Sequence, residues 1–489
     1  MNAIGKIFQT LIGHFLLFAQ GLILTPIVIK VSGAETYGKY ILIASYLGIM
    51  FGISSFGIGI YAKRRLPICD LPNERAKLFF PQFTFQLAMI SCLSIASMFS
   101  FKLAINKGWL NLQDFMIILI LFYLVSYTLY SQTTDYFRYT HKVWVFNLAT
   151  VGQPYLFIGI ALAIFFMTDK LNPNTLVLSS SIASLLVSIP LIRYLYKEIG
   201  FSFRLPNITE LIAELKVGFP SVLTYLVDTI LVGGDRYIIA AILSVRDVGI
   251  YAPAYAIGSL IILIPKVFGV VLPPLLFRYV DLNDFNSAKN LISCVIRLYL
   301  LVSIPYVVGS WVLGERILSL YTTAEIAEKA WPVIPIVATG MIFYGLILIN
   351  SNILYLKLQL KSLFSINAVA AVLNIVLNIV FLKIIPDVVI AAIVTLLSYL
   401  SGYLLLLKQI RSEQINSAVN LKWLFCLLLA SAMMGIAGFW VSNNLGQEGF
   451  SAIILGIFVG VCVYLVILYI FRLASVEFRY ITKWLHIHK

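Results

Sequence analysis

The sequence has little charge and few cysteines. Only 11% of its 489 residues are Asp, Glu, Lys or Arg, whereas a soluble domain has about 25%. The hydrophobic fraction of 61% is more than one buried core can absorb at this length, which excludes a soluble globular protein. The five cysteines are scattered and form no Cys-x-x-Cys pair, so we interpret them as small apolar residues rather than metal ligands. The lipid bilayer must be the solvent for most of the chain.

Catalytic and nucleotide-binding motifs are absent as well. The sequence contains no Gly-x4-Gly-Lys-[Ser/Thr], no His-Glu-x-x-His and no Gly-x-Ser-x-Gly. The segments between its apolar runs are too short for a soluble catalytic domain. We therefore expect no enzymatic activity, no cofactor and no metal. Transport should be secondary or facilitative unless a partner supplies ATP hydrolysis.

Long apolar runs predict an all-α integral membrane protein. A helix that crosses a bilayer needs about 20 apolar residues. Fourteen runs have this length: 7–29, 40–62, 78–101, 115–135, 148–168, 175–196, 217–243, 249–272, 291–313, 331–354, 362–385, 387–407, 422–441 and 450–471. They are too long for barrel strands and do not alternate. Very short turns separate 217–243 from 249–272 and 362–385 from 387–407, so each of these pairs is predicted to be antiparallel.

The net charge is +14, and the Lys and Arg residues behind it are distributed unevenly between the two sides of the membrane. With the N-terminus inside, the loops predicted on the inner side hold 23 of the 35 basic residues and the outer loops hold nine. This is the positive-inside pattern, and it predicts a multi-pass membrane protein with both termini in the cytoplasm. The pattern also explains the basic character without nucleic-acid binding.

Two similar stretches indicate an internal repeat. Ser32-Gly-Ala-Glu-Thr-Tyr-Gly38-Lys-Tyr40 joins the first two spans, and Ser244-Val-Arg-Asp-Val-Gly249-Ile-Tyr251 joins the seventh and eighth, six spans later. The repeat predicts two pseudo-symmetric six-helix lobes, an architecture typical of alternating-access transporters. We expect an N-terminal lobe and linker over 1–216, a C-terminal lobe and linker over 217–421, and two further helices with a cytoplasmic tail over 422–489.

Ionisable residues within span 217–243 are the first candidates for function. A charged side chain at the bilayer centre costs about 2.5–3.5 kcal/mol on insertion scales, so each one needs a role. Asp228 and Asp235 are seven residues apart, which puts them on one helical face, and Arg236 follows directly. Gly233-Gly234 should weaken or bend the helix there. The three residues form either a structural ion pair or a cavity-facing cluster that binds substrate or a coupling ion.

Two further cations, Lys266 and Arg297, lie about six residues from the predicted inner ends of their spans. They either snorkel to the lipid headgroups or supply positive charge to a cavity that opens to the cytoplasm. Pro265 beside Lys266 frees a backbone carbonyl and favours a kink.

Polar and small residues form stripes on two other spans. Asn367, Asn374 and Asn378 share one face of span 362–385, where they either form interhelical hydrogen bonds or line a hydrated path for sugar hydroxyls. A stripe of small residues on span 40–62 favours close helix packing over binding. Its members are Ser45, Gly48, Gly52, Ser55 and Gly59.

Several motifs resemble those of the bacterial polysaccharide-biosynthesis flippases. They are Gly33-Ala-Glu35-x-Tyr37-Gly38-x-Tyr40, Gly218-Phe-Pro220-Ser, Asp235-Arg236-Tyr237-Ile238, Gly249-Ile-Tyr251 and Asn374-x3-Asn378. These flippases are the O-antigen, capsule and teichuronic-acid repeat-unit exporters of the multidrug/oligosaccharidyl-lipid/polysaccharide exporter superfamily. The resemblance covers essentially the whole chain, including the count of fourteen spans.

The resemblance implies that the substrate is an undecaprenyl-diphosphate-linked oligosaccharide repeat unit. Rocking of the two lobes would carry it from the inner to the outer leaflet, with membrane lipids and polymer-assembly proteins as partners. Because Arg and Lys bind phosphate, the three intramembrane cations are candidates to bind the diphosphate. The full set of candidate substrate-binding residues adds two aspartates and two asparagines to these cations. The seven candidates are Asp228, Asp235, Arg236, Lys266, Arg297, Asn374 and Asn378. The alternatives are a drug or cation antiporter of the same superfamily, and a membrane glycosyltransferase or polymerase, which the short outer loops disfavour.

Overall fold

A computed structural model describes residues 3–57, 59, 65–69, 71–106, 114–200, 207–357, 359–411, 420–444 and 450–473. Within these residues the chain forms sixteen α-helices and two short 3₁₀ segments, and no strand. Thirteen of the helices are long and apolar enough to cross a membrane. Each of the fourteen predicted apolar runs overlaps one of these thirteen, because the first helix holds two runs. The prediction of an all-α multi-pass membrane protein is confirmed.

The chain divides into two compact units, Met1–Gly233 and Gly234–Lys489. The boundary lies inside the predicted span 217–243, where the helix is interrupted. The lobe boundaries at 216 and 421 and the pseudo-symmetry between the lobes stay predictions, as does the cytoplasmic placement of both termini.

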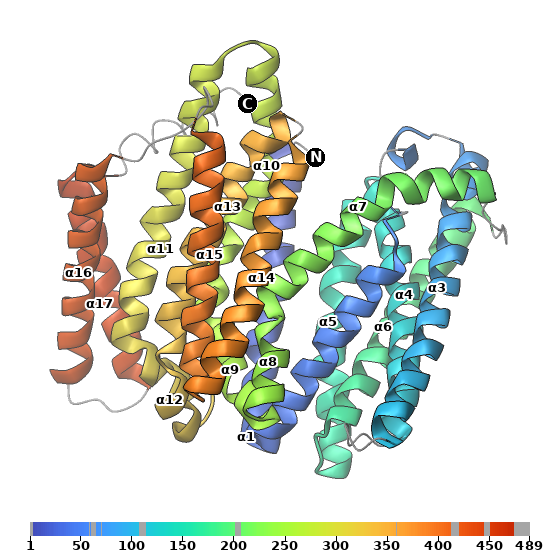
Figure 1. Cartoon of the computed structure of the whole chain (residues 1–489), viewed down its shortest axis with the longest axis horizontal. Helices are drawn as coiled ribbons and strands as arrows, with labels where there is room; N and C mark the ends of the chain where they lie inside the picture. The colour runs from blue at the N-terminus through green and yellow to red at the C-terminus, as the bar shows by residue number, and fades with distance from the viewer. Residues whose placement is uncertain are drawn as a thin grey trace. The chain divides into compact units, whose positions relative to one another are not determined.

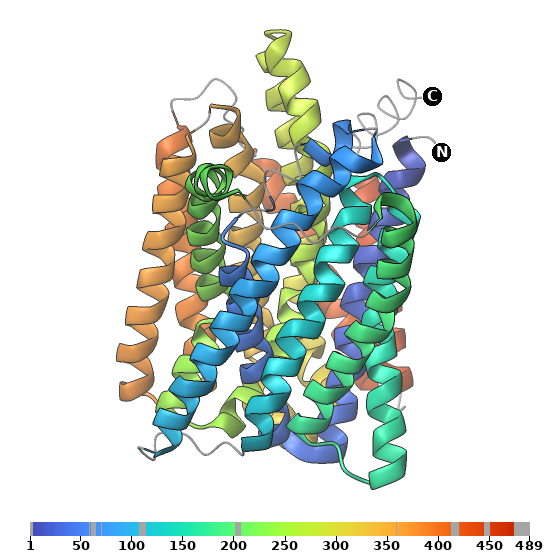
Figure 2. The same cartoon turned by 90° about the vertical axis from the view of Figure 1, so that its right-hand side faces the viewer.

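Unit 1 consists of six helices and a 3₁₀ segment. The helices are α1 (Ala3–Ser54), α3 (Pro72–Asn106), α4 (Asp114–Tyr139), α5 (Val143–Thr168), α6 (Pro173–Ile199) and α7 (Ile208–Gly233), and the 3₁₀ segment is Leu66–Ile68. Helix α4 packs against α3, α5 and α6, and these four helices stand side by side (Figure 1 and Figure 2). Part of their core is aromatic, with Phe79, Tyr136 and Phe137 all buried.

Helix α1 holds the first two predicted spans, joined at a kink. Gly33 has φ 81° and ψ 170°, a conformation that glycine adopts without a steric cost. The hydroxyl groups of Thr25 and Tyr37 lie 2.9 Å apart although the residues are 12 positions apart in sequence. In a straight helix that separation would be about 18 Å. The chain therefore folds back at Gly33, as the predicted turn between the two spans requires.

The second half of α1 packs closely against α7. The Tyr225 hydroxyl donates to the Gly48 carbonyl oxygen at 2.9 Å. A Cβ atom at Gly52 would lie 1.9 Å from the Tyr225 ring, and one at Gly57 would lie 2.2 Å from the carbonyl oxygen of Gly218. Only glycine permits this approach of the two backbones. The structure thus confirms that Gly52 of the small-residue stripe serves helix packing, whereas a Cβ at Gly48 would meet nothing within 4 Å.

Unit 2 consists of ten helices and a 3₁₀ segment, Ser259–Ile262. The helices are α8 (Asp235–Ile242), α9 (Val245–Gly258), α10 (Leu263–Asp281), α11 (Phe285–Tyr321), α12 (Ala324–Ala330), α13 (Val333–Leu356), α14 (Leu360–Ile384), α15 (Val388–Ile410), α16 (Leu421–Asn444) and α17 (Phe450–Ile470). Helix α13 is largely enclosed, because it packs against α9, α10, α11 and α15. Helices α16 and α17 pack against each other and against α11.

The predicted span 249–272 is interrupted by the 3₁₀ segment between α9 and α10. Pro265 has no N–H to donate to the carbonyl of Ile261, four residues earlier and within that segment. The expected distortion next to Lys266 is therefore confirmed.

Candidate functional site

Asp235 begins α8 and is buried, with 3% of its surface exposed. The fully buried Tyr251 donates its hydroxyl proton to Asp235 Oδ2 at 2.6 Å. The backbone N–H of Arg236 donates to Oδ1 at 2.8 Å. Tyr251 comes from α9, which begins after a tight turn capped by Ser244, whose side chain accepts from the N–H of Asp247. Both carboxylate oxygens of Asp235 therefore have a donor, which compensates its burial.

Arg236 faces a chain of tyrosines. Its guanidinium carbon lies 5.5 Å from the centre of the Tyr255 ring, a cation–π contact. The hydroxyl groups of Tyr255 and Tyr399 are 3.4 Å apart, and the Tyr399 ring stacks on Tyr344 at 4.9 Å. These contacts connect α8, α9, α15 and α13. The i, i+4 spacing of Tyr251 and Tyr255 is the only sequence signal for this network.

Asp228 and Asp235 lie on either side of an interruption of the predicted span 217–243. Helix α7 ends at Gly233 and α8 begins at Asp235, while Gly234 between them keeps right-handed helical angles, φ −67° and ψ −29°. Asp228 lies on α7 in unit 1, whereas Asp235 lies in unit 2. The shared face of the two carboxylates stays a prediction. The break falls where the glycine pair was expected to weaken the helix.

Asn374 and Asn378 are fully buried on α14, which packs against α8 and α15. The Asn374 amide donates to the hydroxyl of Thr395 on α15 at 3.3 Å. The Asn378 amide donates to the Asn374 backbone carbonyl at 2.9 Å and to its side-chain oxygen at 3.2 Å. The bond to Thr395 favours the interhelical role of this stripe. The side-chain oxygen of Asn378 is buried and accepts no hydrogen bond from the part of the chain that the structure describes.

Three oxygen-bearing side chains lie on the mutually packed helices α8, α14 and α15. The carboxylate of Asp235, the amide oxygen of Asn378 and the hydroxyl of Thr395 are groups that hard cations prefer. Among the described residues, no three His, Cys, Asp or Glu side chains gather into a metal-binding group. A single carboxylate supplies one negative charge, which suits a proton or a monovalent cation.

Lys266 lines a cavity of about 460 Å³ inside unit 2. Helices α10 and α13 form its walls, and its other polar side chains are Ser351, Asn352 and Tyr355. The apolar part of the lining consists of Pro265, Gly269, Pro273, Leu276, Phe277, Leu348 and Leu356. No acidic residue of the described chain lines the cavity, so the ammonium group of Lys266 sets its charge.

That the seven predicted candidates form one site stays a prediction. Arg297 is half-buried on α11 and is not among the residues that line the Lys266 cavity. Direct hydrogen bonds join Asp235 to Arg236, and Asn374 to Asn378.

Unit 1 contains a charged cluster that the sequence does not predict. Glu198 on α6 accepts from Arg75 at 3.0 Å and from Lys142 at 2.6 Å. Lys142 also donates to the hydroxyl of Tyr194 at 3.1 Å. Burial lowers the pKa of Lys142, but the hydrogen bonds with Glu198 and Tyr194 outweigh this effect and raise it above its ordinary value. The three charged residues come from α3, α6 and the turn before α5.

Known proteins share both the sequence pattern and the fold. The family described as lipid II flippase MurJ matches residues 58–460. A structure of lipid II flippase MurJ in an inward closed conformation aligns with a TM-score of 0.69 at 19% identity, covering 94% of this chain and 98% of that one. An inward-facing multidrug resistance MATE family transporter of the MOP superfamily aligns with a TM-score of 0.66 at 14% identity, covering 86% and 97%.

A second MATE structure extends the structural likeness. The MATE multidrug transporter DinF-BH aligns with a TM-score of 0.59 at 13% identity, covering 84% of this chain and 95% of that one. No curated protein matches the chain. The structural likenesses show the fold, and the family match spans most of the sequence. The chain belongs to the lipid II flippase MurJ family, a family of membrane flippases whose fold is shared with MATE transporters.

Proposed function

We propose that this protein moves a polyprenyl-diphosphate-linked oligosaccharide from the inner to the outer leaflet of the bacterial inner membrane by alternating access. The substrate is the undecaprenyl-diphosphate-linked repeat unit of a surface polysaccharide, such as an O-antigen or a capsule. Family membership supports flipping of a lipid-linked substrate. The repeat unit is supported by the resemblance to polysaccharide flippases across the motifs that contain Asp235, Gly249 and Asn374.

The observation that carries the proposal is the Lys266 cavity. Its volume of about 460 Å³ falls within the range of about 300–1,000 Å³ that is common for ligand sites. A diphosphate needs cationic donors to leave water, and charge-assisted hydrogen bonds are about twice as strong as neutral ones. Lys266 supplies the charge. The donor groups of Ser351 and Asn352 already bond to backbone carbonyls of α13, so their side-chain oxygens serve as acceptors for sugar hydroxyls.

The polyprenyl tail stays in hydrocarbon throughout. Withdrawing apolar surface from lipid would cost about 0.8 kcal/mol per CH₂ exposed to water. The protein therefore needs to shield only the polar headgroup. Leu276 and Phe277 on the wall of the cavity provide an apolar border next to Lys266, which suits a substrate that is part headgroup and part lipid.

The buried carboxylate of Asp235 is the proposed site of the coupling ion. It is held by Tyr251 and by the backbone of Arg236 directly after the break at Gly234. An ion or proton that binds there changes the charge at the first residue of α8. Replacing Asp235 with Asn keeps the shape but removes the charge, and should abolish coupled transport.

Deletion of the gene in its host, with the upstream sugar-assembly genes intact, tests the proposal. Polyprenyl-diphosphate-linked saccharides are then quantified on each leaflet. We expect repeat units to accumulate on the inner leaflet and surface polymer to disappear. Wild-type protein should restore export, Lys266→Arg should restore most of it, and Lys266→Gln should not. Lys383→Gln, an exposed lysine of unit 2, is the matched control and should restore export fully.

Three other outcomes would overturn the proposal. Accumulation of lipid II in place of repeat units would mean that lipid II, after which the family is named, is the substrate. Unchanged lipid-linked pools with altered drug or dye sensitivity would assign an antiporter, whose fold this chain shares. Repeat units that reach the outer leaflet but stay unpolymerised would indicate an enzyme that acts after the flip.

A further inference from the structure

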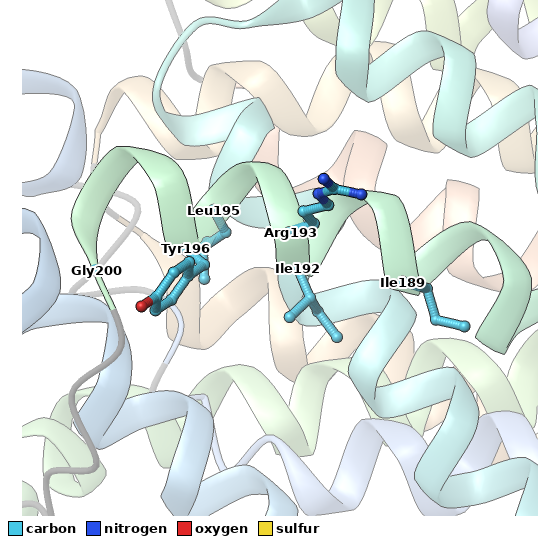
Figure 3. A pocket seen from close by; sticks show the side chains of 6 residues that line it. All are labelled: Ile189, Ile192, Arg193, Leu195, Tyr196 and Gly200. Carbon is cyan, nitrogen blue, oxygen red and sulfur yellow. The ribbon is translucent and has the colours of Figure 1, made fainter.

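Helix α6 carries a surface hollow of about 340 Å³ near its C-terminal end. The lining residues come from this helix and the glycine that ends it: Ile189, Ile192, Arg193, Leu195, Tyr196 and Gly200. Figure 3 shows Ile192 and Tyr196 extending from one edge of the helix and Arg193 from the other. The hollow is thus an apolar surface bordered by a cation.

The positive charge at this end of α6 is not neutralised by the nearest acid. Arg193 and Lys197 are four residues apart, so they are neighbours on the helix surface, and both are exposed. In the described chain neither forms an ion pair. Glu198 is already bound by Arg75 and Lys142, and only 14% of its side chain is exposed. Arg193 and Lys197 therefore keep their charge at the surface.

The surroundings of the hollow are those of a membrane interface. Helix α6 is long and apolar enough to cross a membrane. Ile189 is 60% exposed, and Tyr194 and Tyr196 are 41% and 59% exposed. Amphipathic rings next to basic residues are typical of the depth at which acyl chains meet headgroups. In the predicted topology this end of α6 lies at the cytoplasmic leaflet.

We propose that the hollow on α6 binds an anionic phospholipid of the inner leaflet. An acyl chain lies along Ile189 and Ile192, and the headgroup phosphate contacts Arg193 and Lys197. A zwitterionic lipid would make the same apolar contacts but has no net charge, so the two cations select for the anionic headgroup. The site is in unit 1 and does not involve the Lys266 cavity, so it does not depend on the transported substrate.

Lipid titration of the purified full-length protein, followed by native mass spectrometry, tests the proposal. Phosphatidylglycerol and phosphatidylcholine with identical acyl chains are compared. A basic residue near an anionic surface contributes a factor of about five in affinity. The double variant Arg193→Gln/Lys197→Gln should therefore bind phosphatidylglycerol about 25-fold more weakly and bind phosphatidylcholine unchanged. The control Lys170→Gln/Lys383→Gln removes the same charge from exposed positions elsewhere and should keep the wild-type preference.

A second variant tests the apolar half of the site. Ile192→Trp fills the hollow while leaving both cations in place, and should weaken binding of both lipids. Equal binding of the two lipids by the wild-type protein would overturn the proposal, as would an unchanged preference in the double variant. Competition by glycerol phosphate as strong as that by the intact lipid would assign the site to a soluble phosphate compound.

Discussion

The hydrogen bond between Tyr251 and Asp235 holds the first residue of α8 against α9, and its removal should measurably destabilise unit 2. Tyr251→Phe deletes the hydroxyl that donates to Asp235 Oδ2 at 2.6 Å. The phenyl ring occupies the same volume, so no large cavity forms. Interhelical hydrogen bonds in membrane proteins contribute about 0.6 kcal/mol on average and about 1.7 kcal/mol at most. A bond to a charged acceptor belongs to the upper part of that range, so we expect a loss of about 1.5 kcal/mol in the free energy of unfolding.

A double-mutant cycle in detergent micelles measures this bond. Its corners are the wild type, Tyr251→Phe, Asp235→Leu and the double variant, and leucine is close to aspartate in shape but accepts no hydrogen bond. We expect a coupling free energy of at least about 1 kcal/mol between the two positions. Tyr299→Phe is the matched control, because Tyr299 is equally buried and donates at 2.7 Å to a neutral carbonyl, that of Met341. The Tyr299→Phe substitution should lower the free energy of unfolding by only about 0.6 kcal/mol and should show no coupling to Asp235.

Two results would refute this reasoning. A coupling below about 0.3 kcal/mol is the additivity expected of independent sites, and would mean that the two side chains do not interact in the folded protein. A Tyr299→Phe loss as large as the Tyr251→Phe loss would mean that the charge on Asp235 adds nothing to the bond.

Three further predictions concern other parts of the molecule. Lys266→Gln should slow flipping in reconstituted vesicles by about 10- to 100-fold, because it removes a charge-assisted bond to phosphate; an unchanged rate would exclude Lys266 from the site. Gly57→Ala should destabilise the protein by about 3 kcal/mol, because its Cβ would lie 2.2 Å from the carbonyl oxygen of the facing α7 glycine at a φ of +73°. Gly59→Ala meets nothing within 4 Å and should leave the melting temperature unchanged. Glu198→Gln should lower the free energy of unfolding by about 2 kcal/mol. This loss is below the range for fully buried ion pairs, because the side chains keep some exposure. Since the folded-state pKa of Lys142 is raised, its ion pair is complete at pH 7 and is lost only as the pH rises above 10.5, so the cost of Glu198→Gln should be the same at pH 6 and pH 8.

Interruptions of the helices could be predicted from the sequence because their causes are local. Gly33 adopts a positive φ, the glycine pair precedes the break at Gly234, and Pro265 follows the 3₁₀ segment. Each effect depends on the covalent structure of one residue, a missing Cβ or a missing N–H. The interruption in span 217–243 falls at the glycine pair that was expected to weaken the helix.

The candidate site was predicted only in part. Helical spacing correctly put Asn374 and Asn378 in contact, because residues four apart meet on any helix. The same rule puts Asp228 and Asp235 on one face, which stays a prediction. It could not place Lys266 and Arg297, because it identifies a face of a helix but not the neighbour that covers this face.

The sequence by itself determined the solvent of this protein, its all-helical class and the approximate ends of its spans. These follow from the length and hydropathy of each run, since a backbone in lipid must satisfy its own hydrogen bonds within a helix. Only the tertiary structure decided which polar groups meet. Tyr251 bonds to Asp235, Lys142 to a glutamate 56 residues later, and Asn374 to Thr395 on the next helix. Such pairs depend on how whole helices pack, and packing depends on the shapes of many side chains at once rather than on any local pattern.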